Sequence, residues 1–214
     1  TVSKGLIQAE TGNDTITVGF GGVQSASLKA GVGDDFMSIT GGITDGSLFG
    51  GTGNDSFNFG AAAGGLVDVG SGIDSVLLSG AADSISLTGA LTGTTLKAGG
   101  GTDSIVVQSN VSNGYFEGGA AADTLNFQAS SVSILGTTIK GGAGADQVSL
   151  YGANDVVFDV ASSDSIFGGT GADTMFLTGG YVVSNSIQSG SGSDSIVMSG
   201  TGPSSAMTGN NIDL

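Results

Sequence analysis

The chain contains 214 residues, with 42 glycines, one proline and 19 acidic residues against four basic ones, for a formal net charge of −15. This balance argues against nucleic acid and membrane insertion, because anionic partners require clustered lysine and arginine and no apolar run approaches the roughly 20 residues of a membrane span. Cysteine and histidine are absent. Disulfides, zinc–cysteine sites and the commonest catalytic bases are therefore excluded, and we predict that the chain is not an enzyme.

The hydrophobic fraction of 38% supplies apolar material for a core. The excess of carboxylates suggests bound cations, and the alternative is that acidity only aids solubility. No secretory signal is recognisable at Thr1. A mature chain, an excised fragment and export without an N-terminal signal all fit that observation.

Glycine-rich turns that end in an aspartate recur along the chain. A representative stretch runs from Leu48 to Phe59, where an apolar anchor, the turn Gly50–Asp55 and an alternating strand follow one another. Successive turn aspartates stand 19 to 29 residues apart, with a basic period of about 20, which is typical of solenoids. The turn aspartates are Asp14, Asp35, Asp55, Asp74, Asp103, Asp123, Asp146, Asp173 and Asp194.

Apolar residues hold fixed positions around every turn aspartate. Seven residues before it stand Ile7, Leu28, Leu48, Val67, Leu96, Phe116, Ile139, Ile166 and Ile187. Two residues after it stand Ile16, Met37, Phe57, Val76, Ile105, Leu125, Val148, Met175 and Ile196. Four residues after it stand Val18, Ile39, Phe59, Leu78, Val107, Phe127, Leu150, Leu177 and Met198. This pattern predicts two strands and two turns per coil, and hence an all-β, parallel β-solenoid of about ten coils forming one domain over residues 1–214.

Two coils are longer than the rest, near residues 75–102 and 147–172. Asp83 lies inside the first, and Asp155 and Asp164 lie inside the second, at nine-residue steps from the preceding turn aspartate. Extra half-coils and three-sided coils that bulge from the rod both fit this spacing. These three aspartates lack glycine partners, so the alternative of capping turns by local hydrogen bonds has more weight for them than for the glycine-turn aspartates.

The glycine turns combine backbone carbonyls with one carboxylate, which suits calcium because that ion takes six to eight oxygen ligands in flexible geometry. One turn supplies too few oxygens, so we predict that each ion lies between neighbouring coils, with up to about eight ions in one row. The alternative is that the aspartates only cap turns. Besides the nine turn aspartates, the predicted metal-site residues are Gly12, Gly31, Gly33, Gly51, Gly53, Gly70, Gly72, Gly99, Gly101, Gly142, Gly144, Gly169, Gly171, Gly190 and Gly192.

The turns Gly50–Asp55 and Gly168–Asp173 resemble the GGxGxDxUx nonapeptides of RTX (haemolysin-type) calcium-binding repeats. The resemblance implies a calcium-stabilised parallel β-roll, type I secretion and folding outside the cell. The chain departs from the family in its longer period and in its degenerate opposite turn, such as Gly19–Gly22, which implies a single row of ions. That variant is similar to repeat solenoids of bacterial adhesins and surface-layer proteins. Ice binding would need regular outward threonine and asparagine rows, which the sequence lacks.

We therefore expect a secreted, extracellular or cell-surface structural protein that associates end to end into a filament, surface layer or matrix. The first repeat begins within one turn of Thr1, and residues 210–214 alternate like a further strand, so neither end reads as a polar cap. The alternative is a rigid, calcium-stabilised spacer or binding module of a large adhesin or exported protein, with a carbohydrate or cell-surface partner.

Overall fold

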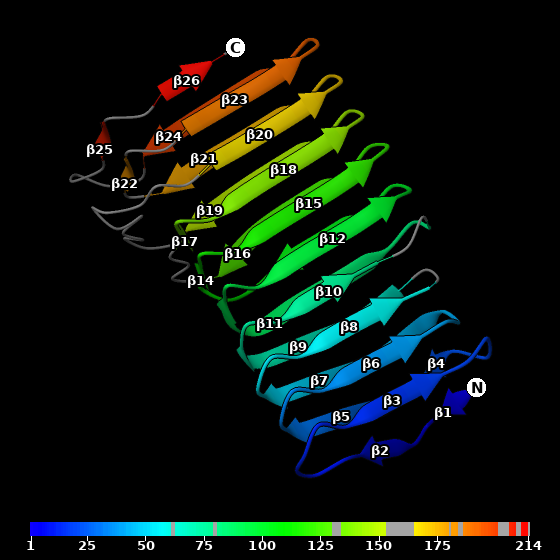
Figure 1. Cartoon of the computed structure of the whole chain (residues 1–214). Helices are drawn as coiled ribbons and strands as arrows, with labels where there is room; N and C mark the ends of the chain where they lie inside the picture. The colour runs from blue at the N-terminus through cyan, green and yellow to red at the C-terminus, as the bar shows by residue number, and fades with distance from the viewer. Residues whose placement is uncertain are drawn as a thin grey trace.

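Two long parallel β-sheets lie face to face and form a solenoid, which confirms the predicted fold class (Figure 1). The computed structural model describes residues 1–60, 63–78, 81–129, 134–152, 165–179, 181–183, 186–200, 206–208 and 211–213. Within these ranges there is no helix, and hence no helix that could cross a membrane. The prediction of a single domain over residues 1–214 stays a prediction.

Sheet A contains strands from every level of the solenoid. They are β1 (Val2–Ser3), β2 (Leu6–Gln8), β4 (Val23–Gln24), β5 (Ser27–Val32), β7 (Ile43–Thr52), β9 (Ala63–Gly72), β11 (Ser84–Thr92), β13 (Ser104–Val107), β14 (Val111–Ser112), β16 (Thr124–Ala129), β17 (Ile134–Leu135), β19 (Gln147–Gly152), β21 (Thr174–Gly179) and β24 (Ser195–Gly200). The main path runs β1-β4-β7-β9-β11-β13-β16-β19-β21-β24, and the short strands β2, β5, β14 and β17 pair beside it.

Sheet B faces sheet A, and its strands pair in chain order. They are β3 (Thr15–Val18), β6 (Phe36–Ile39), β8 (Ser56–Phe59), β10 (Ser75–Leu77), β12 (Thr95–Gly100), β15 (Tyr115–Ala120), β18 (Thr138–Ala143), β20 (Ser165–Thr170), β23 (Ser186–Ser191) and β26 (Asn211–Asp213). A small third sheet pairs β22 (Tyr181–Val183) with β25 (Ala206–Thr208).

The chain alternates between the two sheets, so the solenoid has two edges. At the first edge a strand of sheet A leads into a strand of sheet B, as from β5 to β6. At the second edge a strand of sheet B leads back into sheet A, as from β12 to β13. In Figure 1 the turns after β12, β15, β18, β20 and β23 line the second edge, and the turns into β6, β8 and β10 lie on the opposite side.

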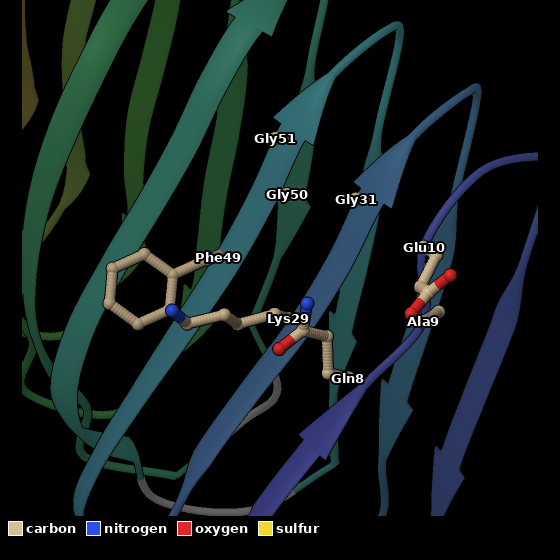
Figure 2. A pocket seen from close by; sticks show the side chains of 8 residues that line it. All are labelled: Gln8, Ala9, Glu10, Lys29, Gly31, Phe49, Gly50 and Gly51. Atoms are coloured by element: carbon tan, nitrogen blue, oxygen red, sulfur yellow. The ribbon is translucent and has the colours of Figure 1, made fainter.

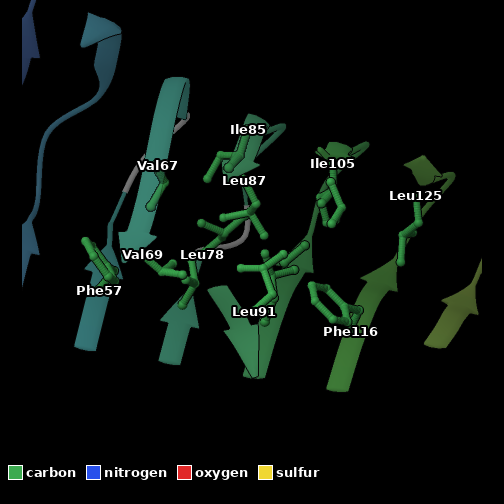
Figure 3. Close-up of a cluster of buried hydrophobic side chains, with 14 of the residues drawn as sticks. Phe57, Val67, Val69, Leu78, Ile85, Leu87, Leu91, Ile105, Phe116 and Leu125 are labelled. Carbon is green, nitrogen blue, oxygen red and sulfur yellow. The ribbon is translucent and has the colours of Figure 1, made fainter. Parts of the chain in front are cut away.

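The predicted apolar positions form the core between the sheets, because alternate side chains of each strand point inward. Nearly all of them are buried, including Phe57, Ile105 and Leu125 (Figure 3). Phe116 and Phe127 meet edge to face, with ring centroids 5.2 Å apart. Ile7, at 36% exposure, is the predicted core residue with the greatest exposure. The side chain of Met198 lies outside those the structure describes.

The first long coil exchanges the roles of the two sheets. Phe57 pairs with Val76, and Val76 pairs with Leu96. Val76 stands two residues after Asp74, and Leu96 stands seven residues before Asp103. The apolar column after the aspartates therefore stacks directly on the apolar column before the next aspartate. Likewise, Val67 pairs with Leu87 on sheet A. The extra segment is thus a half-coil, and the core stays continuous because both columns are apolar.

The second long coil adds no such exchange. Strand β18 still pairs with β20, and β19 still pairs with β21, so the order within both sheets is unchanged. The half-coil alternative is therefore wrong for this segment. Residues 153–164, which include Asp155 and Asp164, lie outside the described residues.

A sharp bend precedes the long part of each early sheet A strand. Lys4, Ser25 and Asp45 occupy equivalent positions there, with φ angles of 51°, 48° and 52°. Asp45 sits at the point where the pairing of β7 with β9 shifts register. Aspartate tolerates this left-handed conformation better than most residues, because its short polar side chain hydrogen-bonds locally.

Candidate metal centre

The glycine turns of successive coils stack directly on one another. Gly51 and Gly53 have φ angles of 115° and 126°, which glycine adopts without steric cost. A Cβ atom on Gly51 would overlap the carbonyl oxygen of Gly31, and one on Gly53 would overlap that of Gly33. These carbonyl oxygens therefore point along the solenoid axis into the space beside the next turn. Every glycine predicted as a metal-site residue has a positive φ.

The turn of Asp123 keeps this geometry without the usual glycine. Ala121 replaces glycine two residues before the aspartate and adopts a φ of 80°. A Cβ on Gly144 would overlap the carbonyl oxygen of Ala121, as in the glycine turns. The preceding Gly119, which we did not predict, has a φ of 117°. The backbone path thus persists where the motif has decayed.

The turn aspartates form two hydrogen-bonded ladders. In each rung the backbone N–H of one aspartate donates to Oδ1 of the aspartate one coil further on, over 2.7–3.0 Å. The first Asp row, at the first edge, contains Asp14, Asp35, Asp55 and Asp74. The second Asp row, at the second edge, contains Asp83, Asp103, Asp123, Asp146, Asp173 and Asp194.

The prediction of one row is therefore wrong. Asp74 and Asp103 follow each other as glycine-turn aspartates in the sequence, yet they lie at opposite edges because a half-coil separates them. Asp83, which we left out of the predicted metal-site residues, stands at the start of the second row. The sequence did mark Asp83 in another way, because it lies nine residues after Asp74 and is followed by the alternating segment Ser84–Leu87. The assignment of the other predicted residues as metal ligands stays a prediction.

The second carboxylate oxygen in most rungs is buried and has no hydrogen-bond partner. Asp103 and Asp123 are each 1% exposed, and their Oδ2 atoms make no hydrogen bond. The same holds for Oδ2 of Asp35, Asp55, Asp74, Asp146 and Asp173. A buried charge without a partner is costly, so a column of such atoms indicates that a cation belongs beside them.

Burial raises the pKa of six of these carboxyl groups, since loss of water disfavours the charged form. The pKa rises to about 6 for Asp74 and Asp103 and to about 7 for Asp123. The pKa of Asp55, Asp146 and Asp173 is also raised, again mainly by burial. The hydrogen bond from the neighbouring N–H opposes the shift, and the charge of the neighbouring aspartate adds to it.

The available donors fit calcium. Across the described residues, no three acidic, histidine or cysteine side chains gather at one point. Each interval between coils instead offers carboxylate oxygens from two aspartates, together with backbone carbonyls from the stacked turns. This all-oxygen set suits calcium, which accepts mixed carboxylate and carbonyl ligands in flexible geometry, better than magnesium, which requires a strict octahedron.

The scarce lysines lie on the outer faces beside aromatic rings. The Lys29 Nζ atom is 5.3 Å from the centre of the Phe49 ring, and Lys140 Nζ lies 5.2 Å from Tyr115 and 5.8 Å from Phe167. Such contacts contribute modestly at exposed sites. These lysines extend outward from the sheets, whereas the turn carboxylates are buried. These three contacts therefore place no lysine charge beside the buried Asp carboxylates.

A groove of about 430 Å³ lies on the outer face of sheet A near the first coils. Its walls include Gln8, Glu10, Lys29 and Phe49, and glycine backbone forms much of its floor. Figure 2 shows Lys29 extended towards the Phe49 ring. Gly31 and Gly51, two of the predicted metal-site glycines, also line this groove, and a carbohydrate partner stays a prediction.

A second, exposed ladder flanks the first Asp row. Oδ1 of Asn13 accepts a hydrogen bond from the N–H of Asp34, Oδ1 of Asp34 from Asn54, and Oδ1 of Asn54 from Ile73. The ladder ends at Ile73, which has no polar side chain to continue it. This short polar row does not provide the long regular surface that ice binding would need.

Comparison with protein families agrees with this geometry. The model of the RTX calcium-binding nonapeptide repeat (four copies) matches residues 137–158 and 151–181. Residues 137–181 of the chain therefore carry RTX calcium-binding repeats. The matched stretch contains the RTX turns of Asp146 and Asp173, both in the second Asp row. No curated protein and no solved structure gives a significant match to the chain.

Acidification is expected to stabilise the calcium-free chain. A carboxyl group whose pKa is raised by folding adds stability below its unfolded pKa, and this stability is lost as pH rises through the folded pKa. The pH window lies between the ordinary aspartate pKa of 3.8 and the raised pKa of about 7 for Asp123. Lowering the pH of the metal-free chain from about 8 to about 5 should therefore restore strand signal in circular dichroism.

Saturating calcium should reverse this trend, because protons compete with the ion for the same carboxylates. The expected midpoint without calcium lies near pH 6, above the range of about 4 in which exposed carboxyl groups titrate. Calcium-free stability that increases with pH would contradict the prediction.

Proposed function

We propose that the chain is an exported structural protein whose coils are held together by calcium. The main support for this proposal is that both Asp rows contain buried Oδ2 atoms that lack hydrogen bonds. RTX repeats bind calcium, and the matched segment is continuous with the same ladder geometry on either side. Bound calcium supplies positive charge to both carboxylates of an interval, and the chain holds these oxygens in place by rigid stacking of the turns.

Export and folding outside the cell follow from the same proposal. A chain whose buried carboxylates need calcium is poorly folded where the ion is scarce, since binding and folding are linked. It would then acquire its structure in a calcium-rich extracellular space. No catalytic role is proposed, because the site offers oxygen ligands and stacked backbone without a general base such as histidine.

Self-assembly into a filament, surface layer or matrix is the finer part of the proposal. Strand β2 pairs with β5 on one side, and it carries the exposed side chains of Leu6 and Ile7. An unpaired parallel edge of this kind accepts a further strand. A second copy that presents a matching edge would extend both sheets along the axis.

Negative-stain electron microscopy in calcium tests this assembly. Fibres or sheets are expected for the purified chain, with loss of these structures on chelation. A Leu6→Lys variant should shorten or abolish them, because a charge at the edge strand opposes pairing, whereas Phe20→Lys serves as a control at another exposed apolar position. Isolated rods alone would contradict assembly and favour the alternative, a rigid spacer or binding module of a larger exported protein.

A further inference from the structure

We propose that Asp83 begins a second calcium array that is separate from the first, and that Asp83 and Asp103 hold one ion between them. Asp74 and Asp103 are consecutive in the repeat pattern, but they hold no common ion. This inference rests on the proposed calcium function and extends it to an aspartate outside the glycine motif. The support comes from strand register at both edges and from the geometry of the Asp83 turn.

Strand register shows where the first Asp row ends. Ser75 pairs with Thr95, which pairs with Tyr115 and then Thr138. The residues directly before these strands therefore occupy one column at the first edge. After Asp14, Asp35, Asp55 and Asp74, this column continues with Thr94, Gly114 and Thr137. None of these three carries a carboxylate, so the first row stops at Asp74.

The same argument shows where the second Asp row starts. Ser84 pairs with Gly64 and with Ser104, so Asp83 shares a column with Ala63 below it and Asp103 above it. Further down, Ala63 pairs with Ile43, and Ile43 pairs with Val23. The column is therefore apolar up to Ala63 and acidic from Asp83 onward. Asp83 and Asp103 are its first pair of carboxylates.

The Asp83–Asp103 interval has the same polar geometry as the glycine-turn intervals. The N–H of Asp83 donates to Oδ1 of Asp103 over 2.8 Å, and the two residues are 3% and 1% exposed. Oδ2 of Asp103 is buried and makes no hydrogen bond. This unpartnered oxygen belongs to a carboxylate that faces the Asp83 turn, so it indicates that a cation belongs in this interval.

The Ala81 carbonyl also makes the Asp83–Asp103 interval similar to the glycine-turn intervals. A Cβ on Gly101 would lie 2.5 Å from the carbonyl oxygen of Ala81. Ala81 therefore directs its carbonyl towards the next turn, as Gly33 does towards Gly53. Alanine at this position is compatible with the site, because Ala121 holds the same place in the Asp123 turn. The motif fails to mark Asp83 because Ser79 and Ala81 stand where most other turns have glycine, four and two residues before the aspartate, while the Ala81 carbonyl keeps its position against the next turn.

No ion can bridge the two rows, because the strands run from one edge to the other and a four-residue strand alone spans about 13 Å. The first array has the intervals Asp14–Asp35, Asp35–Asp55 and Asp55–Asp74. The second has Asp83–Asp103, Asp103–Asp123, Asp123–Asp146, Asp146–Asp173 and Asp173–Asp194. Replacing the expected Asp74–Asp103 interval by Asp83–Asp103 leaves the expected maximum number of ions unchanged.

The number of calcium ions per chain tests the inference directly. Wild type and Asp83→Asn should be compared by equilibrium dialysis against calcium, with elemental analysis of the bound metal. We expect Asp83→Asn to bind one ion fewer. The matched control is Asp45→Asn, which removes the same charge from an exposed bend outside both rows. Equal stoichiometry for Asp83→Asn and Asp45→Asn would overturn the inference.

A double-mutant comparison separates the two arrangements further. Asp83→Asn and Asp103→Asn should be non-additive in calcium loss because they share an ion, whereas Asp74→Asn and Asp103→Asn should be additive. The reverse pattern would restore the single row. If wild type binds no calcium, the proposed function itself fails, which is distinct from a failure of Asp83 alone.

Wild-type protein provides a measurement that does not depend on a folded variant. With gadolinium as a paramagnetic substitute for calcium, the amide resonances of Asp83 and Ser84 should broaden as strongly as those of Asp103 and Ser104. Sharp resonances at Asp83 beside broadened ones at Asp103 would overturn the proposal.

Discussion

Chelation of calcium with EGTA at neutral pH is expected to abolish most of the strand signal in circular dichroism, and added calcium should restore it. The reason is the burial of the turn carboxylates. Asp55, Asp74 and Asp103 are at most 2% exposed and keep Oδ2 atoms without hydrogen bonds. Without a counter-ion these groups must either carry an unpaired buried charge or take up protons, and both oppose folding at neutral pH.

The expected size of the effect is large compared with ordinary protein stability. A ligand that binds only the folded state at 100 times its Kd stabilises it by about 2.7 kcal/mol per site. Four such sites would contribute on the order of 10 kcal/mol, which is comparable to the whole stability of about 5–15 kcal/mol that a typical domain has. Loss of all ions should therefore unfold the chain rather than loosen it.

The control for this experiment is magnesium at the same concentration. It should restore much less strand signal, because magnesium dehydrates reluctantly and requires a strict octahedral geometry that stacked turns do not impose. Sodium chloride at matched ionic strength tests simple screening. An unchanged strand signal in EGTA would show that the aspartates act only as turn caps.

Replacement of Gly53 by alanine is expected to lower the thermal midpoint in saturating calcium far more than replacement of Gly12. Both glycines have a positive φ, 126° and 118°, so the backbone strain is similar. A Cβ on Gly53 would overlap the carbonyl oxygen of Gly33, whereas a Cβ on Gly12 meets nothing within 4 Å. The difference between the two variants therefore isolates the overlap between neighbouring coils.

We expect Gly12→Ala to cost about 1–3 kcal/mol from strain alone. Gly53→Ala should exceed about 4 kcal/mol, because backbone on both sides must move and a carbonyl of the calcium site moves with it. For a chain of this size each kcal/mol corresponds to roughly 2–4 °C in the midpoint. Gly19→Ala, with open space and no positive φ, should change little. Equal shifts for Gly12 and Gly53 would contradict close stacking of the turns.

The sequence alone was sufficient for the fold class and for the core. Alternation of polar and apolar residues in segments such as Ser56–Phe59 predicts a strand with one buried face, and the period of about 20 predicts how these strands stack. The structure buries Phe57 and Phe59 as expected. Glycine spacing likewise predicted positions with positive φ, such as Gly51 and Gly53, because few other residues adopt that backbone.

The second gap shows a limit of spacing as a guide. Asp146 and Asp173 are separated by 27 residues, yet the N–H of Asp146 donates to Oδ1 of Asp173 over 2.9 Å as in any other rung. The gap of 29 residues between Asp74 and Asp103, nearly the same length, instead contains a half-coil. Length does not distinguish an insertion within a coil from an added strand, because strand pairing decides which residues stack.

What the sequence determined by itself was therefore the local unit: strand, glycine turn, aspartate and inward apolar positions. Tertiary structure alone decided at which edge each unit lies. The physical reason is that the inward columns before and after the aspartate are both apolar, so Val76 stacks equally well on Phe57 and beneath Leu96. The core accepts the half-coil without a break, while the aspartates move to the opposite edge. That exchange ends one row at Asp74 and begins the other at Asp83.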